Sequence, residues 1–303
     1  MNVMKTVKNL EIPKGKIDVV LDTDAFNEID DQFAIAYMLR SQEKLNVRAI
    51  YAAPFENDKS DSAKDGVEKS YNEILKILGM LEENKTVLKG SDRWLGDEET
   101  PVISPAAEHL AKLAEEYSPE NPLYVVEIAA ITTVASALLI NPRIAENLVI
   151  VWLGGNSVSY GENDEFNMRQ DVAAARVVFK SGAALVQLPC RGVVDTFRIS
   201  RPELLYWLKG KNELCDYLAD IAVKEGDFYA DSEIWTRVIW DVTAVAWLLN
   251  DNERFMRYRI TERHIPTYDL RYTCGEKNTY MNYVYAVERD KLMEDLIKKL
   301  TEI

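Results

Sequence analysis

The segment from Asp22 to Asp31 carries the residues best suited to chemistry in this chain. It has the sequence Asp-Thr-Asp-Ala-Phe-Asn-Glu-Ile-Asp-Asp, and five of its ten residues are acidic. Two carboxylates about 4 Å apart repel by roughly 4 kcal/mol at an effective dielectric constant of about 20. Such a cluster requires a cation, a proton or wide separation, and a hard divalent cation with oxygen ligands meets that requirement. The alternative is an acidic helix start, where Asp and Glu cap free N–H groups and complement the helix dipole.

Two further polar segments follow apolar runs. Thr132 and Thr133 follow the apolar run 123–128, and a strand-to-helix turn there leaves a carbonyl or hydroxyl free at the sheet edge. A threonine helix cap is the simpler interpretation of this pair. Gly154-Gly155-Asn156 follows the apolar run 148–153, and paired glycines allow a tight turn or close approach of the backbone to a ligand.

Two later segments hold polar side chains suited to binding. Glu165-Phe166-Asn167 offers hydrogen-bonding partners for sugar hydroxyls, and a polar loop with Asp171 as a helix N-cap is the alternative. Trp240-Asp241 lies in an apolar segment, where a carboxylate is costly unless it is paired or bound to metal. The two histidines suggest no catalytic triad, since His109 lies among charged residues and His264 is interpreted as structural.

The elements that position these residues alternate between apolar runs and amphipathic segments. Strands are expected at Val19–Asp22, Val47–Ala52, Leu123–Ile128, Leu148–Leu153 and Ala184–Leu188. Helices are expected at Asp31–Arg40, Asp61–Leu78, Ala106–Tyr117, Thr133–Ile140 and Asp171–Lys180. This alternation predicts an α/β fold with an open, mostly parallel sheet flanked by helices. The acidic segment then lies at the carboxyl end of a strand, where open sheets bind ligands.

From Pro202 onward the sequence becomes mainly helical. Helices are expected at Pro202–Leu208, Glu213–Val223 and Thr236–Leu249, a strand at Tyr258–Thr261, and a last helix from Asp290. No Pro/Gly/Ser-rich linker and no repeat interrupts the chain. Residues 1–303 are therefore expected to form a single domain in which the helical C-terminal part caps the sheet.

Composition narrows the class of partner. The 303 residues include 50 acids against 36 bases, for a formal net charge of −14. This charge disfavours nucleic acid and anionic membranes, and it favours a small-molecule substrate or a metal ion. The sparse cysteines, Cys190, Cys215 and Cys274, lack metal-ligand spacing and indicate a reducing compartment. Met1 to Leu10 has no apolar core typical of a signal peptide, and no stretch approaches a membrane span, so a cytoplasmic protein is expected.

Taken in order, four segments resemble the motifs of the inosine-uridine-preferring nucleoside hydrolases. They are Asp22-x-Asp24 with Asp30-Asp31, Ile131-Thr132-Thr133, Gly154-Gly155 with Glu165-Phe166-Asn167, and Trp240-Asp241. The likeness spans about residues 17 to 260. That family has an open α/β fold and hydrolyses the N-glycosidic bond of ribonucleosides to ribose and free base with a tightly held calcium ion. The resemblance implies the same reaction here, in purine and pyrimidine salvage, and a homodimer or homotetramer.

The resemblance also implies roles for individual residues. Asp24 would ligate calcium and act as the base that activates the calcium-bound water. Asp31, the main-chain carbonyl of Thr132 and the carboxylate of Asp241 would complete the protein ligands. Asp30 would bind ribose hydroxyls. The other residues expected to bind substrate are Asn27, Asn156, Glu165, Asn167 and Trp240, with Glu165 and Asn167 on the sugar and its 5′ side.

Three departures from the family pattern matter. Asp24 and Asp30 are separated by five residues where the family motif has three, so the loop must bulge, and Asn27 or Glu28 is expected to contact the sugar or close the pocket. Trp240 stands where the family often has a histidine that protonates the leaving base. Losing a general acid costs about 10²–10⁴ in rate, and Trp240 is expected to stack on the base or pack in the core. The turn 52–55 lacks the family's asparagine, which Asn57 would replace.

Other functions compete with this interpretation. Phosphoryl-transfer enzymes of the haloacid dehalogenase class also begin with strand-Asp-x-Asp, but Phe26 stands where that class has Thr or Val, and Gly154-Gly155-Asn156 has no acidic pair. A non-catalytic protein that binds nucleosides or ribose conjugates is the stronger alternative, because Trp240 replaces the acid. Retained turnover would separate these two. Hydrolysis of a different ribosyl conjugate is the third alternative.

Overall fold

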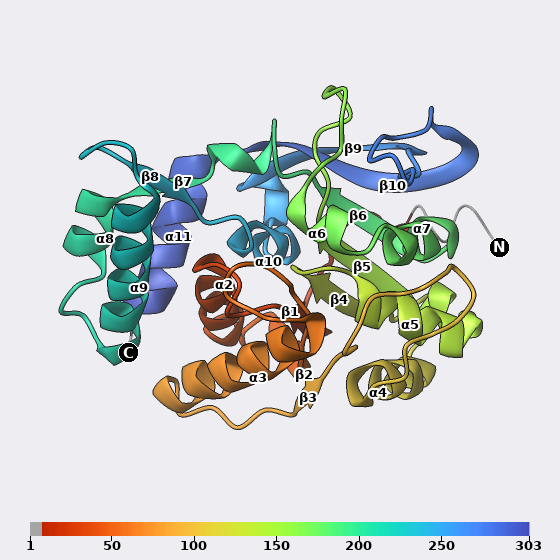
Figure 1. Ribbon diagram of the computed structural model, residues 1–303, viewed down its shortest axis with the longest axis horizontal. Helices are drawn as coiled ribbons and strands as arrows, with labels where there is room; N and C mark the ends of the chain where they lie inside the picture. The colour runs from red at the N-terminus through yellow and green to blue at the C-terminus, as the bar shows by residue number, and fades with distance from the viewer. Residues whose placement is uncertain (1–7, 303) are drawn as a thin grey trace.

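The computed structural model describes residues 8–302, and its centre is an eight-stranded sheet in the order β3-β2-β1-β4-β5-β6-β10-β9 (Figure 1). The strands of this sheet are β1 (Ile17–Thr23), β2 (Leu45–Ala52), β3 (Val87–Lys89), β4 (Leu123–Glu127), β5 (Leu148–Leu153), β6 (Ala184–Leu188), β9 (Met256–Arg263) and β10 (Glu276–Val287). All neighbouring strands are parallel except β9, which is antiparallel to β10. The prediction of an open, mostly parallel sheet is confirmed.

Helices cover both faces of the sheet. On one face lie α2 (Asp30–Leu39), α3 (Ala63–Met80), α8 (Arg201–Trp207), α9 (Glu213–Tyr229), α10 (Val242–Leu248) and α11 (Arg289–Thr301). On the other lie α4 (Pro105–Leu113), α5 (Thr132–Ile140) and α7 (Val172–Lys180). Alternate strand residues contribute to two hydrophobic cores, one on each face of the sheet. In β1, Val19 and Leu21 lie in the first core and Val20 lies in the second. This two-residue period explains why the strands are apolar throughout.

The order of the strands determines where a ligand can bind. β1 lies between β2 and β4, so the chain moves outward in one direction through β2 and β3 and in the other through β4, β5 and β6. Open sheets bind ligands beyond the carboxyl ends of the strands where this direction reverses. The acidic segment follows β1 at that position, since β1 ends at Thr23.

The C-terminal third differs from the prediction in two places. The predicted helix Thr236–Leu249 is wrong: β8 (Thr236–Val238) pairs with β7 (Arg198–Ser200), and α10 begins only at Val242. Its first residues include β-branched side chains that suit a strand. β10 was not predicted, and together with β9 it extends the sheet, so the C-terminal part adds strands as well as covering helices. Figure 1 shows α8, α9 and α11 standing together at one side of the sheet.

Several short elements were also not predicted. They are β3, β7 and the five-residue helix α6 (Phe166–Gln170). The segment Met1 to Leu10, interpreted as no signal peptide, lies largely outside the described residues. Among residues 8–302, no helix combines the length and the apolar character needed to cross a membrane.

Candidate active site

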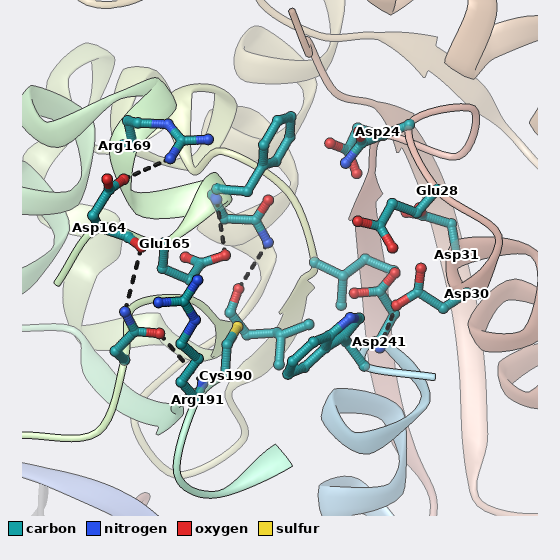
Figure 2. Close-up of a pocket in the computed structure, with 17 residues that line it drawn as sticks. Asp24, Glu28, Asp30, Asp31, Asp164, Glu165, Arg169, Cys190, Arg191 and Asp241 are labelled. Atoms are coloured by element: carbon teal, nitrogen blue, oxygen red, sulfur yellow. Dashed lines mark hydrogen bonds and ion pairs between the residues drawn. The ribbon is translucent and has the colours of Figure 1, made fainter. Parts of the chain in front are cut away.

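A cavity of about 270 Å³ lies at the carboxyl ends of four adjacent strands. Asp24 follows β1, Ile128 follows β4, Leu153 ends β5, and Cys190 lies two residues beyond β6. Figure 2 shows acidic side chains from the acidic segment and Asp241 on one wall, facing a second wall built from Glu165 and its neighbours. Every substrate-binding residue expected from the sequence lines this cavity, namely Asn27, Asp30, Asn156, Glu165, Asn167 and Trp240.

The first wall brings three carboxylates together. One oxygen from each of Asp30, Asp31 and Asp241 lies within 4.8 Å of the others, and all three residues are buried. Asp24 lies outside this group of three but near enough that the charges of Asp30 and Asp31 act on its carboxyl group. The Thr23 hydroxyl donates to Asp31 Oδ1 over 2.5 Å, and the Asp241 N–H approaches Asp30 Oδ2 at 3.3 Å. We call these four aspartates, Asp24, Asp30, Asp31 and Asp241, the acidic cluster.

Burial and nearby negative charges raise the pKa of every member of the acidic cluster. Burial raises the pKa of Asp24 well above its usual range, and the negative charges of Asp31 and Asp30 raise it further. The pKa values of Asp30 and Asp241 are raised well above normal for the same two reasons. Burial raises the pKa of Asp31 to about 7, against the opposing hydrogen bond from Thr23. The cluster therefore holds protons unless a cation takes their place.

Asp241 reaches the acidic cluster from the start of helix α10. Asp241 occupies the N-cap position of α10, yet its side chain makes no capping hydrogen bond, so the carboxylate is free to point into the cluster. The prediction that Asp241 is buried is confirmed, because only 5% of it is exposed. The prediction that it lies inside a helix is wrong.

Side chains from outside the loop hold the loop that carries Asp24 in place. Gln32 donates to the carbonyl of Ala25 over 2.8 Å, and Lys59 Nζ donates to the carbonyl of Asn27 over 2.8 Å. Asn57 Nδ2 donates to Asn27 Oδ1 over 2.7 Å and does not line the cavity. Asn57 thus fixes Asn27 rather than replacing the family's asparagine in the pocket. The expected bulge exists, and it presents both Asn27 and Glu28 to the cavity.

Glu165 organises the second wall. It is the N-cap of α6 and accepts backbone N–H groups from Asn167, Met168 and Gly155 over 2.7–3.0 Å. Gly155 adopts φ +75°, and a Cβ there would lie 2.1 Å from Tyr272 Oη, so this turn requires glycine. Burial raises the pKa of Glu165, and the three backbone N–H groups oppose that rise.

Two asparagines complete the second wall. Asn167 donates from Nδ2 to the carbonyl of Leu153 over 3.0 Å, which ties α6 to the end of β5. The side-chain amide of Asn156 forms two hydrogen bonds with the backbone. It donates to the carbonyl of Asp164 over 3.4 Å and accepts from the N–H of Arg191 over 3.3 Å. Both side chains therefore hold the wall in place while lining it.

Thr132 does not line the cavity. Its hydroxyl donates to Asp171 Oδ2 over 2.7 Å, and Asp171 caps α7 by accepting the N–H of Ala174. The Asp171 cap is confirmed, whereas the threonine helix cap is wrong. Ile131 occupies the N-cap of α5, and the Thr133 hydroxyl accepts from Ser91 N.

Seven lining residues were not singled out from the sequence as site residues: Ile128, Leu153, Asp164, Phe166, Arg169, Cys190 and Arg191. Cys190 and Arg191 follow β6, and their place after a predicted strand was the signal that could have found them. The Cys190 thiol lies beside Glu165, and burial followed by that carboxylate raises the pKa of Cys190 well above normal. Cys190, Cys215 and Cys274 are all free thiols.

The acidic cluster fits a hard metal ion. Asp24 Oδ2 is buried and has no hydrogen-bond partner among the described residues. No lysine or arginine within residues 8–302 forms an ion pair with any of the four aspartates. Crowded carboxylate oxygens without a basic partner are the ligand set that calcium or magnesium takes.

Comparison with known proteins places this site in a family. The sequence model of the inosine-uridine preferring nucleoside hydrolases matches residues 19–294. No curated protein matches. A plant nucleoside hydrolase is similar in structure at a TM-score of 0.74 and 17% identity, covering 96% of this chain and 100% of that one.

Two bacterial structures are similar to the same degree. A purine-preferring ribonucleoside hydrolase from Gardnerella vaginalis gives a TM-score of 0.73 at 18% identity and covers 94% of this chain and 98% of that one. An inosine-uridine preferring nucleoside hydrolase from Bacillus anthracis gives 0.70 at 16%, covering 95% and 100%. These likenesses establish the fold, and the family match argues against the dehalogenase-type alternative. The chain belongs to the inosine-uridine preferring nucleoside hydrolase family and is an N-ribosyl hydrolase.

Proposed function

We propose that this enzyme hydrolyses the N-glycosidic bond of ribonucleosides to ribose and free base, with the acidic cluster holding calcium. The observation that supports the proposal most directly is that one cavity unites the acidic cluster with Glu165 and Asn167. These are the two halves a riboside hydrolase needs, one for the nucleophile and one for the sugar.

Calcium fits the cluster better than a transition metal because all available side-chain ligands are carboxylate oxygens. Asp24, Asp31, Asp241 and the main-chain carbonyl of Thr132 are the proposed ligands. The Thr132 carbonyl rests on the family resemblance alone. When bound, such an ion supplies positive charge that keeps the carboxylates ionised and lowers the pKa of nearby water.

The chain's own residues carry the other steps. Asp24 is the proposed base, since its buried and unpartnered Oδ2 can accept the proton of the attacking water. Asp30 is proposed to accept ribose hydroxyls. The ionised cluster also stabilises the positive charge that develops on the sugar as the base departs.

The second wall orients the sugar. Glu165 already takes three backbone N–H groups, so its position is fixed before substrate arrives. Glu165 and Asn167 are proposed to bind the sugar and its 5′ side, and Asn27 and Asn156 to shape the pocket around it. Trp240 is proposed to face the base.

The domain organisation, location and assembly of the enzyme belong to the same proposal. Residues 1–303 are proposed to form one domain, because both hydrophobic cores lie against the same sheet. A cytoplasmic location, a role in purine and pyrimidine salvage and a homo-oligomeric state extend the family resemblance. The free thiols accord with a reducing compartment.

The test is ribose release from a panel of purine and pyrimidine ribonucleosides, with calcium and after chelation. The panel includes 4-nitrophenyl β-D-ribofuranoside, whose leaving group departs without a proton. Calcium-dependent release from any of the ribonucleosides supports the proposal, and release from the nitrophenyl riboside, an O-glycoside, shows that the ribosyl site is active. Absence of release from all of them, with calcium bound, contradicts it.

A further inference from the structure

The loop between β9 and β10, residues 264–275, packs behind the second wall although it is about a hundred residues away in sequence. β10 pairs with β6, and β9 pairs with β10 at the edge of the sheet. Within the loop, Pro266 and Tyr272 form an antiparallel bridge. The Arg176 side chain of α7 donates to the carbonyl of Pro266 over 2.6 Å, so the loop is fixed against the body of the fold.

Two groups of this loop contact the segment that forms the second wall. The carbonyl of Leu270 accepts the N–H of Asn163 over 2.7 Å. The Tyr272 hydroxyl lies against Gly155, since a Cβ at that glycine would lie 2.1 Å from Tyr272 Oη. The same hydroxyl accepts a hydrogen bond from Gln187 Nε2 over 2.7 Å. Tyr272 makes these contacts without lining the cavity.

The turn of residues 154–156, which we call the glycine turn, is held at three points. Gln187 Nε2 donates to its first carbonyl over 2.9 Å, and its last N–H donates to Asn163 Oδ1 over 2.7 Å. Its central N–H, that of Gly155, donates to Glu165 Oε2 over 2.7 Å. Gln187 and Asn163 are fully buried and do not line the cavity. The turn that binds Glu165 is therefore positioned by side chains outside the cavity.

The N–H of Gly155 has a particular importance for Glu165. The other two N–H groups that Glu165 accepts, those of Asn167 and Met168, belong to its own helix α6 and move with it. Gly155 donates from the end of β5, so its N–H fixes the Glu165 carboxylate relative to the sheet. A misplacement of about 1 Å can cost roughly 100-fold in rate. Loss of the Tyr272 hydroxyl would leave space beside Gly155 and take one acceptor from Gln187.

We propose that Tyr272 is a positioning residue for the 5′ side of the sugar. It acts through the glycine turn on Glu165 and makes no contact with the substrate itself. The inference rests on the proposed function, in which Glu165 binds the sugar and its 5′ side. The loop between β9 and β10 thereby takes part in substrate binding from outside the cavity.

The experiment measures kcat and KM, with calcium, for inosine and uridine and for their 5′-deoxy forms. Tyr272→Phe is expected to lower kcat/KM for inosine and uridine about 3- to 10-fold, mainly through a higher KM, because one buried hydrogen bond is lost. The same variant is expected to change kcat/KM for the 5′-deoxy forms by less than about 2-fold, because they lack the hydroxyl on which Glu165 acts. An equal loss on both kinds of substrate, or no loss on either, overturns the positioning role while the proposed hydrolysis stands. If the wild type cleaves none of the four ribosides, both proposals fail.

Two further variants complete the test. Gln187→Met removes the donor shared by Tyr272 Oη and the glycine turn, and it should show the same loss confined to substrates with a 5′-hydroxyl. Tyr268→Phe is the matched control, because it removes a hydroxyl from the same loop at a side chain that is 61% exposed and bonded to Glu98 over 3.1 Å. It should behave as wild type on all four ribosides. A loss in Tyr268→Phe as large as that in Tyr272→Phe would contradict the role given to Tyr272.

Discussion

The acidic cluster leads us to predict two effects of the substitution Asp31→Asn, one on stability without metal and one on the response to calcium. The substitution keeps the shape of the side chain and leaves Oδ1 able to accept the Thr23 hydroxyl, now 2.5 Å from Asp31. It removes one charge from a group of three carboxylates. The variant is therefore expected to be more stable than the wild type in chelator and less responsive to calcium.

The magnitude follows from the geometry. Two ionised oxygens 4.8 Å apart repel by roughly 3 kcal/mol at an effective dielectric constant of about 20, and Asp31 has two such neighbours. A second route starts from the pKa of Asp31, which rises from 3.8 to about 7. Ionising that group in the folded state then costs about 4 kcal/mol above pH 7. We expect a gain of about 2–4 kcal/mol, which raises Tm by roughly 3–6 °C in chelator at pH 8 for a chain of 303 residues.

The assay is thermal unfolding followed by circular dichroism, with EDTA and with calcium in excess. Wild-type protein is expected to gain about 3 kcal/mol at a calcium concentration near 100 times Kd. Asp31→Asn should lose most of that gain. Asp92→Asn, which removes a half-exposed charge paired with Arg93, is the matched control and should behave as wild type. A chelated Asp31→Asn variant less stable than chelated wild type would refute the repulsion argument.

Three further predictions concern protons, catalysis and the second wall. Because the folded-state pKa of Asp31 is raised, its contribution to metal-free stability is full below about pH 4 and is lost as pH rises through about 7. Tm in EDTA should therefore fall between about pH 4 and 7 and level off above that, and a flat profile would contradict this. Asp24→Asn should reduce kcat for ribose release by about 10²–10⁴ without lowering the calcium-free Tm, and unchanged turnover would exclude Asp24 as the base. Gly155→Ala should raise KM for ribosides, because its Cβ would lie 2.1 Å from Tyr272 Oη and displace the N–H bound by Glu165, whereas Gly161→Ala, with nothing within 4 Å of its Cβ, should not.

The parallel core of the fold was predictable because its strands are apolar on both faces. β5 and β6 match the predicted ranges Leu148–Leu153 and Ala184–Leu188. The failures lie where local pattern is weak. β10 begins with four polar residues, Glu-Lys-Asn-Thr, that are exposed or half-buried, and β8 is only three residues long, so tertiary pairing rather than propensity determines both.

The site was predictable where chemistry concentrates in sequence. The acidic segment and Glu165 could be predicted because they are acidic residues that follow predicted strands. Cys190 and Arg191 also follow a predicted strand, but they form no recognisable motif, and they reach the cavity because β6 ends beside β5. The role of Asn57 in holding Asn27 could not be predicted either, since it depends on the path of the bulged loop.

The central claim is that the acidic cluster binds one calcium ion that ribosyl hydrolysis requires. The most direct test is to titrate calcium into metal-free protein while measuring bound calcium and ribose release from 4-nitrophenyl riboside in the same samples. We predict that activity rises with occupancy and saturates at one ion per chain, and that Asp241→Asn loses both together. Full activity in metal-free protein, or unchanged calcium binding in Asp241→Asn, would contradict the claim.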